Sequence, residues 1–195
     1  MTRKQARSIQ TYERVLDAAA AEFAQHGYPS TNLQNVVART GLTKGALYGH
    51  FSSKEQLAAV LVSQFDEAVQ ALVSAVETSG APALGQLRTL TCSLAEELHS
   101  DIRISAALRL VVDEAQASVQ PPAALTELRA HVLALVHQAQ KEEDIEPELP
   151  AEPVADLVIA VLFGAHYMAP ATDGKDLPSR VRDMWTILEP TLRGR

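Results

Sequence analysis

Hydrophobic residues recur along the chain at steps of three and four positions, and this spacing predicts helices. Over residues 8–26 the apolar positions form one stripe, which is the pattern of an amphipathic helix. No stretch alternates apolar and polar residues with enrichment in β-branched side chains. The fold class predicted is therefore all-α, with about nine helices in total. The remaining helices are expected at residues 33–39, 44–50, 54–78, 83–99, 101–117, 122–143, 151–169 and 177–192.

Residues that commonly end or cap helices stand at the breaks between the first four helices. Gly27 is placed as the glycine that ends the first helix, and Gly41 supplies the permissive backbone of a tight turn. Glu55 lies three residues beyond Ser52, as in a capping box. The candidate N-caps are Ser30, Thr31 or Asn32 for the second helix, Thr43 for the third, and Ser52 or Ser53 for the fourth.

The order helix, short helix, four-residue turn with glycine, short helix describes a helix-turn-helix. In that motif the second short helix enters the major groove of DNA and leads with its N-terminal residues. Here that helix begins at Lys44, so Lys44 adds positive charge and the Thr43 hydroxyl can meet a phosphate or a base edge. Tyr48 lies four residues beyond Lys44, on the same helical face.

Three further residues complete this candidate interface. Gly45 has no side chain to hold the backbone away from DNA, and His50 and Lys54 follow in positions suited to the phosphate strand. Each side chain could instead pack or hydrogen-bond at the surface. The residues predicted to contact DNA on this basis are Thr43, Lys44, Gly45, Tyr48, His50 and Lys54.

Charge is spread unevenly over the 195 residues. Residues 1–54 hold seven Lys or Arg and three acidic residues, whereas the whole chain carries a net charge of −7. A basic N-terminal part suits a polyanionic partner that the acidic remainder would repel. Chance scatter of surface charge is the alternative interpretation.

Composition also bears on the compartment. The single cysteine, Cys92, excludes an internal disulfide framework and suits a reducing environment. No apolar segment follows the basic N-terminus as in a secretory signal, and no uninterrupted apolar run approaches the length of a membrane span. A cytoplasmic protein without a membrane partner is expected.

The stretch "GYPSTNLQNVVARTGLTKGALYGHFSSKEQL" resembles the N-terminal domain of the TetR family of transcriptional repressors. The resemblance implies a helix-turn-helix domain at residues 1–53 and a ligand-binding and dimerisation domain at residues 54–195, connected by the long helix 54–78. Thr31 matches a helix-start position that often meets a phosphate. Gly49 departs from the family, in which a large residue is common at this position, and it deletes a side chain that could touch DNA.

By the same resemblance, the protein is expected to be a homodimer that binds double-stranded, pseudo-palindromic operator DNA and is released by a small molecule. The segments "AALRLVVDEA", followed by "PP", and "RDMWTILEPTL" are similar to the γ-butyrolactone receptor branch, which regulates secondary metabolism. Leu128 stands where such receptors usually carry a pocket tryptophan. Some branch members respond instead to antibiotics, so an antibiotic-like effector is the alternative.

The ligand pocket is expected to be mainly apolar with a few polar groups. For His166 the alternative is an ordinary core histidine, and for Trp185 it is a core or interface position. The candidate lining residues are Gln64, Leu108, Leu128, Leu162, His166 and Trp185.

Two other classes of function remain as alternatives. An enzyme is disfavoured because the six histidines are scattered and no H-x-x-x-H, cysteine cluster, G-x-S-x-G or phosphate loop occurs. No catalytic residue, metal or cofactor is expected. The other alternative is a ligand-binding partner protein without strong DNA affinity, which Gly49 would mark.

Overall fold

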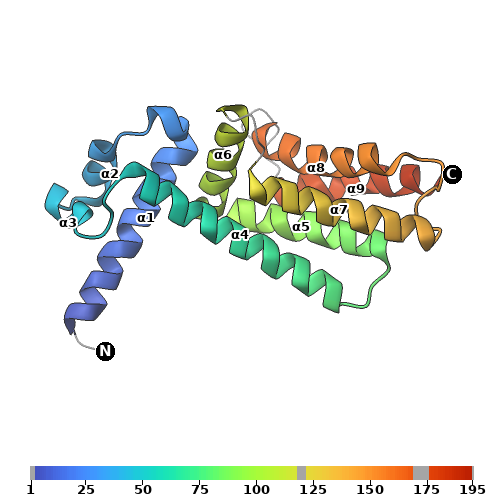
Figure 1. The fold of residues 1–195 in the computed structure, drawn as a ribbon, viewed down its shortest axis with the longest axis horizontal. Helices are drawn as coiled ribbons and strands as arrows, with labels where there is room; N and C mark the ends of the chain where they lie inside the picture. Colours follow the sequence, from blue (N-terminus) through green and yellow to red (C-terminus); the bar gives the residue numbers. More distant parts are fainter. Residues whose placement is uncertain (1–2, 118–121, 169–175, 195) are drawn as a thin grey trace. The chain divides into compact units, whose positions relative to one another are not determined.

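The computed structural model describes residues 3–117, 122–168 and 176–194, and in these it contains nine helices and no strand (Figure 1). The predicted all-α fold is confirmed. The helices are α1 (Arg3–Ser30), α2 (Leu33–Thr40), α3 (Lys44–Tyr48), α4 (Lys54–Thr78), α5 (Ala83–Ser100), α6 (Ile102–Ala117), α7 (Ala123–Lys141), α8 (Ala151–Met168) and α9 (Leu177–Leu192).

Most predicted helix ends lie close to the observed ones, but the predicted start of α1 was wrong. The helix begins at Arg3 rather than Ser8, because residues 3–7 are exposed and mostly polar and therefore carry no apolar stripe. The predicted break at Gly27 is present, because the backbone leaves helical geometry there with φ +70° and ψ 176°. The bounds of α1 run on to Ser30 across this kink. α3 ends at Tyr48, two residues before the predicted end, and Gly49 follows as its C-cap.

The chain divides by its contacts into two compact units. The first comprises Met1–Glu67 and Asp101–Pro122, and the second Ala68–Ser100 and Ala123–Arg195. This division cuts α4 after residue 67 and groups α6 with α1–α3. The sequence-based boundary between residues 53 and 54 separates a DNA-binding domain from a ligand-binding domain. It is defined by function rather than by contacts, and it stays a prediction.

In the first unit α6 packs along α1, and α2 and α3 pack on α1 and on each other. Phe23 and Leu108 are fully buried between these helices. Tyr12 stacks on Phe51 with ring centroids 4.8 Å apart, which fixes the segment after α3 to α1. Burial of each such side chain contributes about 2 kcal/mol, so these contacts hold the short helices in place.

In the second unit α5, α7, α8 and α9 run side by side as a bundle (Figure 1). Trp185 is buried, and its indole N–H donates a hydrogen bond of 2.7 Å to the hydroxyl of Thr91, which joins α9 to α5. The buried Arg180 guanidinium donates to the carbonyl of Ala165 at 2.7 Å and joins α9 to α8. These bonds satisfy polar groups that would otherwise be costly to bury.

By length and composition alone, α4 and α8 are apolar enough to cross a membrane, with 22% and 33% of their most apolar windows buried in this structure. Such composition is weak evidence, since core helices of water-soluble proteins share it. The expectation of no membrane partner stays a prediction.

Candidate nucleic-acid interface

Local hydrogen bonds shape the helix-turn-helix. The Asn32 side chain caps α2 by accepting from the Gln34 N–H at 2.9 Å. Gly41 ends α2 in the left-handed conformation, with φ +63°. Thr43 caps α3 by accepting from the Ala46 N–H at 3.2 Å. Asn32, Gly41 and Thr43 therefore have the turn and capping functions that the sequence indicates.

The capping box before α4 is shifted by one residue from its predicted position. The Ser53 hydroxyl accepts from the Gln56 N–H at 3.2 Å, and the Gln56 side chain accepts from the Ser52 N–H at 2.7 Å. Gln56, rather than Glu55, thus supplies the reciprocal bond. This leaves the Glu55 side chain available to contact the α1–α2 turn.

The helix α3 presents its predicted contact residues to solvent. Leu47 is buried and docks the helix, whereas Thr43, Lys44, Gly45 and Tyr48 are exposed. The Lys44 ammonium lies 5.8 Å from the centroid of the Tyr48 ring, as expected for side chains on one helical face. An exposed tyrosine and an exposed lysine on a rigid helix suit contacts with sugar and phosphate.

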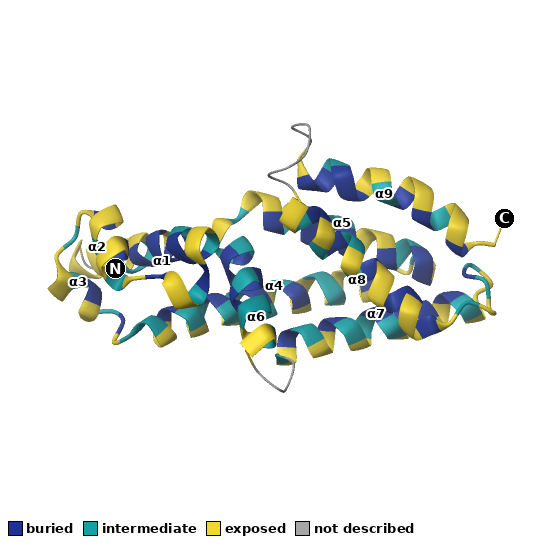
Figure 2. Ribbon diagram, turned by 90° about the horizontal axis from the view of Figure 1, so that it is seen from above, coloured by how far each residue is buried: buried dark blue, intermediate teal, exposed yellow. Residues whose placement is uncertain are grey.

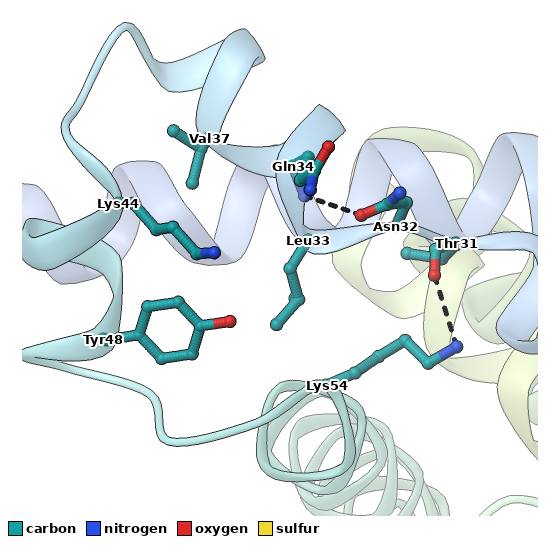
Figure 3. A pocket seen from close by; sticks show the side chains of 8 residues that line it. All are labelled: Thr31, Asn32, Leu33, Gln34, Val37, Lys44, Tyr48 and Lys54. Atoms are coloured by element: carbon teal, nitrogen blue, oxygen red, sulfur yellow. Dashed lines mark hydrogen bonds between the residues drawn. The ribbon is translucent and has the colours of Figure 1, made fainter.

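A cleft of about 410 Å³ separates α3 from the start of α2 (Figure 3). The Lys44 and Tyr48 side chains extend from α3 toward Leu33 of α2 across this cleft. Asn32 and Gln34 are exposed beside it, and sequence analysis did not select them as contact residues. Their place at the start of α2 is the signal that could have identified them. The full lining is Thr31, Asn32, Leu33, Gln34, Val37, Lys44, Tyr48 and Lys54.

Two predicted DNA contacts have partners within the protein. The Lys54 ammonium donates to the carbonyls of Tyr28 at 2.8 Å and Thr31 at 3.2 Å, and it lies 4.4 Å from the Tyr28 ring centroid. Thr31 is buried, and its hydroxyl donates to the Gly27 carbonyl at 2.7 Å. Both residues therefore fix the α1–α2 turn to the start of α4, and their DNA contacts stay predictions.

His50 lies at the edge of the same surface. It is half-buried, and its ring meets the Tyr12 ring edge-on with centroids 6.2 Å apart. This packing orients His50, and a contact between His50 and DNA stays a prediction.

The basic residues of the N-terminal part fall into two groups. Arg14 donates to the Thr40 carbonyl at 2.6 Å, and Arg39 pairs with the buried carboxylate of Glu22. The second group is exposed and has no hydrogen bond or ion pair through its side chains within the described part of the chain. It consists of Arg3, Lys4, Arg7 and Lys44. Arg3, Lys4 and Arg7 extend the candidate interface along the start of α1, where sequence analysis predicted only an overall basic charge.

The predicted ligand-binding residues are divided between the two units. Gln64 and Leu108 belong to the first unit, and the other four belong to the second, so no single pocket within either unit contains all six. Leu108, Leu128 and Leu162 are buried, and His166 is half-buried, which lowers the pKa of its imidazole. Trp185 borders a cleft of about 400 Å³ along α5 and α9. A role for these residues in ligand binding stays a prediction.

Comparison with known proteins agrees with this geometry. Residues 15–61 match the family described as bacterial regulatory proteins of the tetR family. The A-factor receptor protein of Streptomyces griseus is 28% identical over 97% of this chain, and the chain spans 66% of that protein, just under two thirds.

Solved structures extend the similarity over nearly the whole chain. A γ-butyrolactone receptor described as ArpA-like is 27% identical, with a TM-score of 0.79, over 96% of this chain and 98% of that one. The TetR family protein CprB of Streptomyces coelicolor, solved with its operator sequence, is 30% identical, with a TM-score of 0.77, over 94% of this chain and 88% of that one. Because these similarities cover both the helix-turn-helix and the helical remainder, the chain belongs to the TetR family of bacterial regulatory proteins.

Proposed function

We propose that this protein is a ligand-responsive transcriptional repressor that binds operator DNA through α3 and the start of α2. The observation that carries the proposal is the exposed face of α3. Lys44 and Tyr48 are exposed to solvent on this face, whereas Leu47 on the opposite side is buried. A helix docked in this way can enter the major groove without unfolding its own core. The unpaired cations at the start of α1 add attraction for the phosphate backbone.

The proposed repressor acts as a homodimer. Two recognition helices reach successive major grooves about 34 Å apart only when two chains are joined, and a single short helix binds weakly at cellular salt. Leu157 on α8 and Ile187 on α9 are large apolar residues that remain exposed. Figure 2 shows exposed positions along both helices. Tyr167 and Met168, at the end of α8, are also exposed. We assign this surface of α8 and α9 to the dimer interface, because burying it removes apolar area from water.

Replacing Ile187 with lysine is expected to separate the dimer. Ile187 is 73% exposed in one chain, and a lysine buried there between two chains would be an unpaired charge out of water. Light scattering at micromolar concentration should give twice the 21.0 kDa chain mass for the unmodified protein and the single mass for Ile187→Lys. The control is Ile102→Lys, which changes an isoleucine on α6 that is 48% exposed and should leave the dimer intact. A dimer in Ile187→Lys as stable as the original would exclude this interface.

The effector that we propose is a small, mainly apolar molecule, either a γ-butyrolactone or an antibiotic-like compound. The support for a lactone is the similarity to the A-factor receptor and to a γ-butyrolactone receptor. Leu128, at the position where the resemblance implies a pocket tryptophan, favours the antibiotic-like alternative. The proposed target genes belong to secondary metabolism or antibiotic production. The effector acts by binding the DNA-free state more tightly than the DNA-bound state, with a coupling of about 1–3 kcal/mol.

Selection of DNA from a random pool by the purified protein tests the proposal. We expect an inverted repeat whose half-site centres lie about 10 base pairs, or a multiple of this, apart. In a gel-shift assay, binding of the selected duplex should exceed that of random DNA by roughly a thousandfold or more. Equal affinity for both would refute the repressor and favour a partner protein without operator specificity.

A further inference from the structure

A second cleft, of about 590 Å³, lies within the first unit, away from α3. Its walls come from the α1–α2 turn, the first half of α4 and the C-terminal half of α6. The lining residues are Tyr28, Pro29, Glu55, Ala58, Ala59, Val62, Ser63, Asp66, Leu110, Asp113, Glu114 and Ala117. None of the six residues predicted to bind the effector is among them.

Much of this wall is apolar and made of short side chains. Ala58, Ala59 and Val62 provide the α4 side, and Leu110 and Ala117 provide the α6 side. The short side chains on α4 leave room for a rigid body, and contact with these apolar walls removes apolar ligand area from water. The volume is within the range of small-molecule sites.

Carboxylates give the cleft a strong charge bias. Four of its lining residues are acidic, and no Lys, Arg or His is among the described residues that line it. Nearby cations are turned to other partners: Lys54 donates to two backbone carbonyls, and Arg109 donates to the Ala24 carbonyl at 2.9 Å. The Lys54 ammonium also attracts the Glu55 carboxylate and helps to lower its pKa. With four acidic lining residues and no cation among the described ones, the cleft still carries an excess of negative charge.

The acidic residues of the cleft have different roles. The Asp113 carboxylate accepts from the Tyr28 N–H at 2.9 Å, which fixes α6 to the end of α1. The Glu55 carboxylate accepts from the Tyr28 hydroxyl at 3.0 Å, and hydrogen bonds from its own backbone N–H, from Ser53 and from Tyr28 lower its pKa, so it is ionised at neutral pH. Glu114 is exposed and forms no hydrogen bond or ion pair in the part of the chain that the structure describes.

We propose that this cleft binds an organic cation with a compact apolar body. The apolar walls of α4 and α6 would contact the body, and the carboxylates of Glu55 and Glu114 would attract the charge. Charge complementarity selects this class over a neutral lactone or an anion, since like charges facing one another in a partly desolvated site cost free energy. None of the six residues predicted to line the effector pocket lines this cleft, and the proposal does not depend on the proposed function.

Titration calorimetry of the full-length protein with tetraphenylphosphonium tests the inference. Tetraphenylborate has nearly the same size and shape with the opposite charge, so it is the matched control ligand. We expect saturable binding of one tetraphenylphosphonium per chain and at least tenfold weaker binding of tetraphenylborate. Equal binding of the two ions, or no saturation by the cation, would overturn the proposal.

Variants locate the binding within the cleft. Glu55→Gln combined with Glu114→Gln keeps side-chain size and an acceptor for Tyr28, and it should weaken cation binding about tenfold. The control combines Glu67→Gln and Glu127→Gln, two exposed glutamates that do not line the cleft, and should leave binding unchanged.

Ala58→Leu gives an independent test, because it fills the cleft from the α4 wall without changing charge, and should also weaken binding. A dissociation constant that stays the same in both cleft variants, or that rises equally in the control, places the cation elsewhere and overturns the assignment.

Discussion

Lys44→Ala is expected to weaken operator binding roughly thirtyfold at 0.15 M salt, because a dimer loses two phosphate contacts. Lys44 is exposed on α3, and its ammonium has no carboxylate partner among the described residues. Its charge is therefore available to displace condensed counterions from DNA. The slope of log K against log salt should decrease in magnitude by about 2, and fluorescence anisotropy over a series of salt concentrations measures both quantities.

Tyr48→Ala is expected to weaken operator binding by a similar factor, and Tyr48→Phe separates the contribution of the hydroxyl from that of the ring. Because Tyr48 is uncharged, neither change should alter the salt slope. Lys141→Ala is the control for charge, since Lys141 is exposed at the end of α7, outside the candidate interface. Unchanged affinity and slope in Lys44→Ala, with the dimer intact, would remove α3 from the interface.

The helix-turn-helix could be predicted closely because local interactions specify it. Asn32 and Thr43 cap their helices through bonds to backbone groups two and three residues ahead, and the left-handed Gly41 ends α2. Such bonds depend only on neighbouring residue types, so their sequence spacing carries the information. The start of α1 was missed for the converse reason, since exposed polar turns of a helix leave no periodic pattern.

The role of individual basic residues could not be predicted, because it depends on distant partners. Lys54 and Tyr28 are 26 positions apart, and the backbone carbonyl that binds the ammonium has no signature in the sequence. Arg39 likewise resembles a free cation until its pairing with the buried Glu22 is known. Counting charged residues predicts that the net charge of the N-terminal part is positive. Only the fold distinguishes exposed cations from those with structural partners.

The cavities were equally inaccessible to sequence reasoning. An apolar stripe predicts that Leu108 and Leu162 are buried, as they are, but burial in a packed core and lining of a cavity give the same pattern. The acidic cleft joins Tyr28 to Asp113, which are 85 positions apart. Its existence depends on how α6 packs along α1 and on where α4 lies relative to both, and no local signal in the sequence records that arrangement.

Gly27→Ala is expected to lower the free energy of unfolding by about 3 kcal/mol. With φ +70° and ψ 176°, Gly27 occupies a backbone region that is almost restricted to glycine, and strain there costs about 1–3 kcal/mol. A Cβ at this position would also lie 2.8 Å from the Asp113 carboxylate oxygen and 3.3 Å from Nε of Arg109. Moving Asp113 away breaks its bond to the Tyr28 N–H, which removes about 1 kcal/mol more.

Gly41→Ala is the comparison for a positive φ without a close contact. Gly41 also has a positive φ, +63°, but no atom lies within 4 Å of its added Cβ, so the expected cost is only about 1 kcal/mol. Urea denaturation followed by helical circular dichroism compares the two variants. Equal destabilisation would mean that Asp113 and Arg109 do not enclose Gly27 in solution. A larger loss is expected in Gly27→Ala, because its backbone conformation is more restricted to glycine and its Cβ would displace the Asp113 carboxylate.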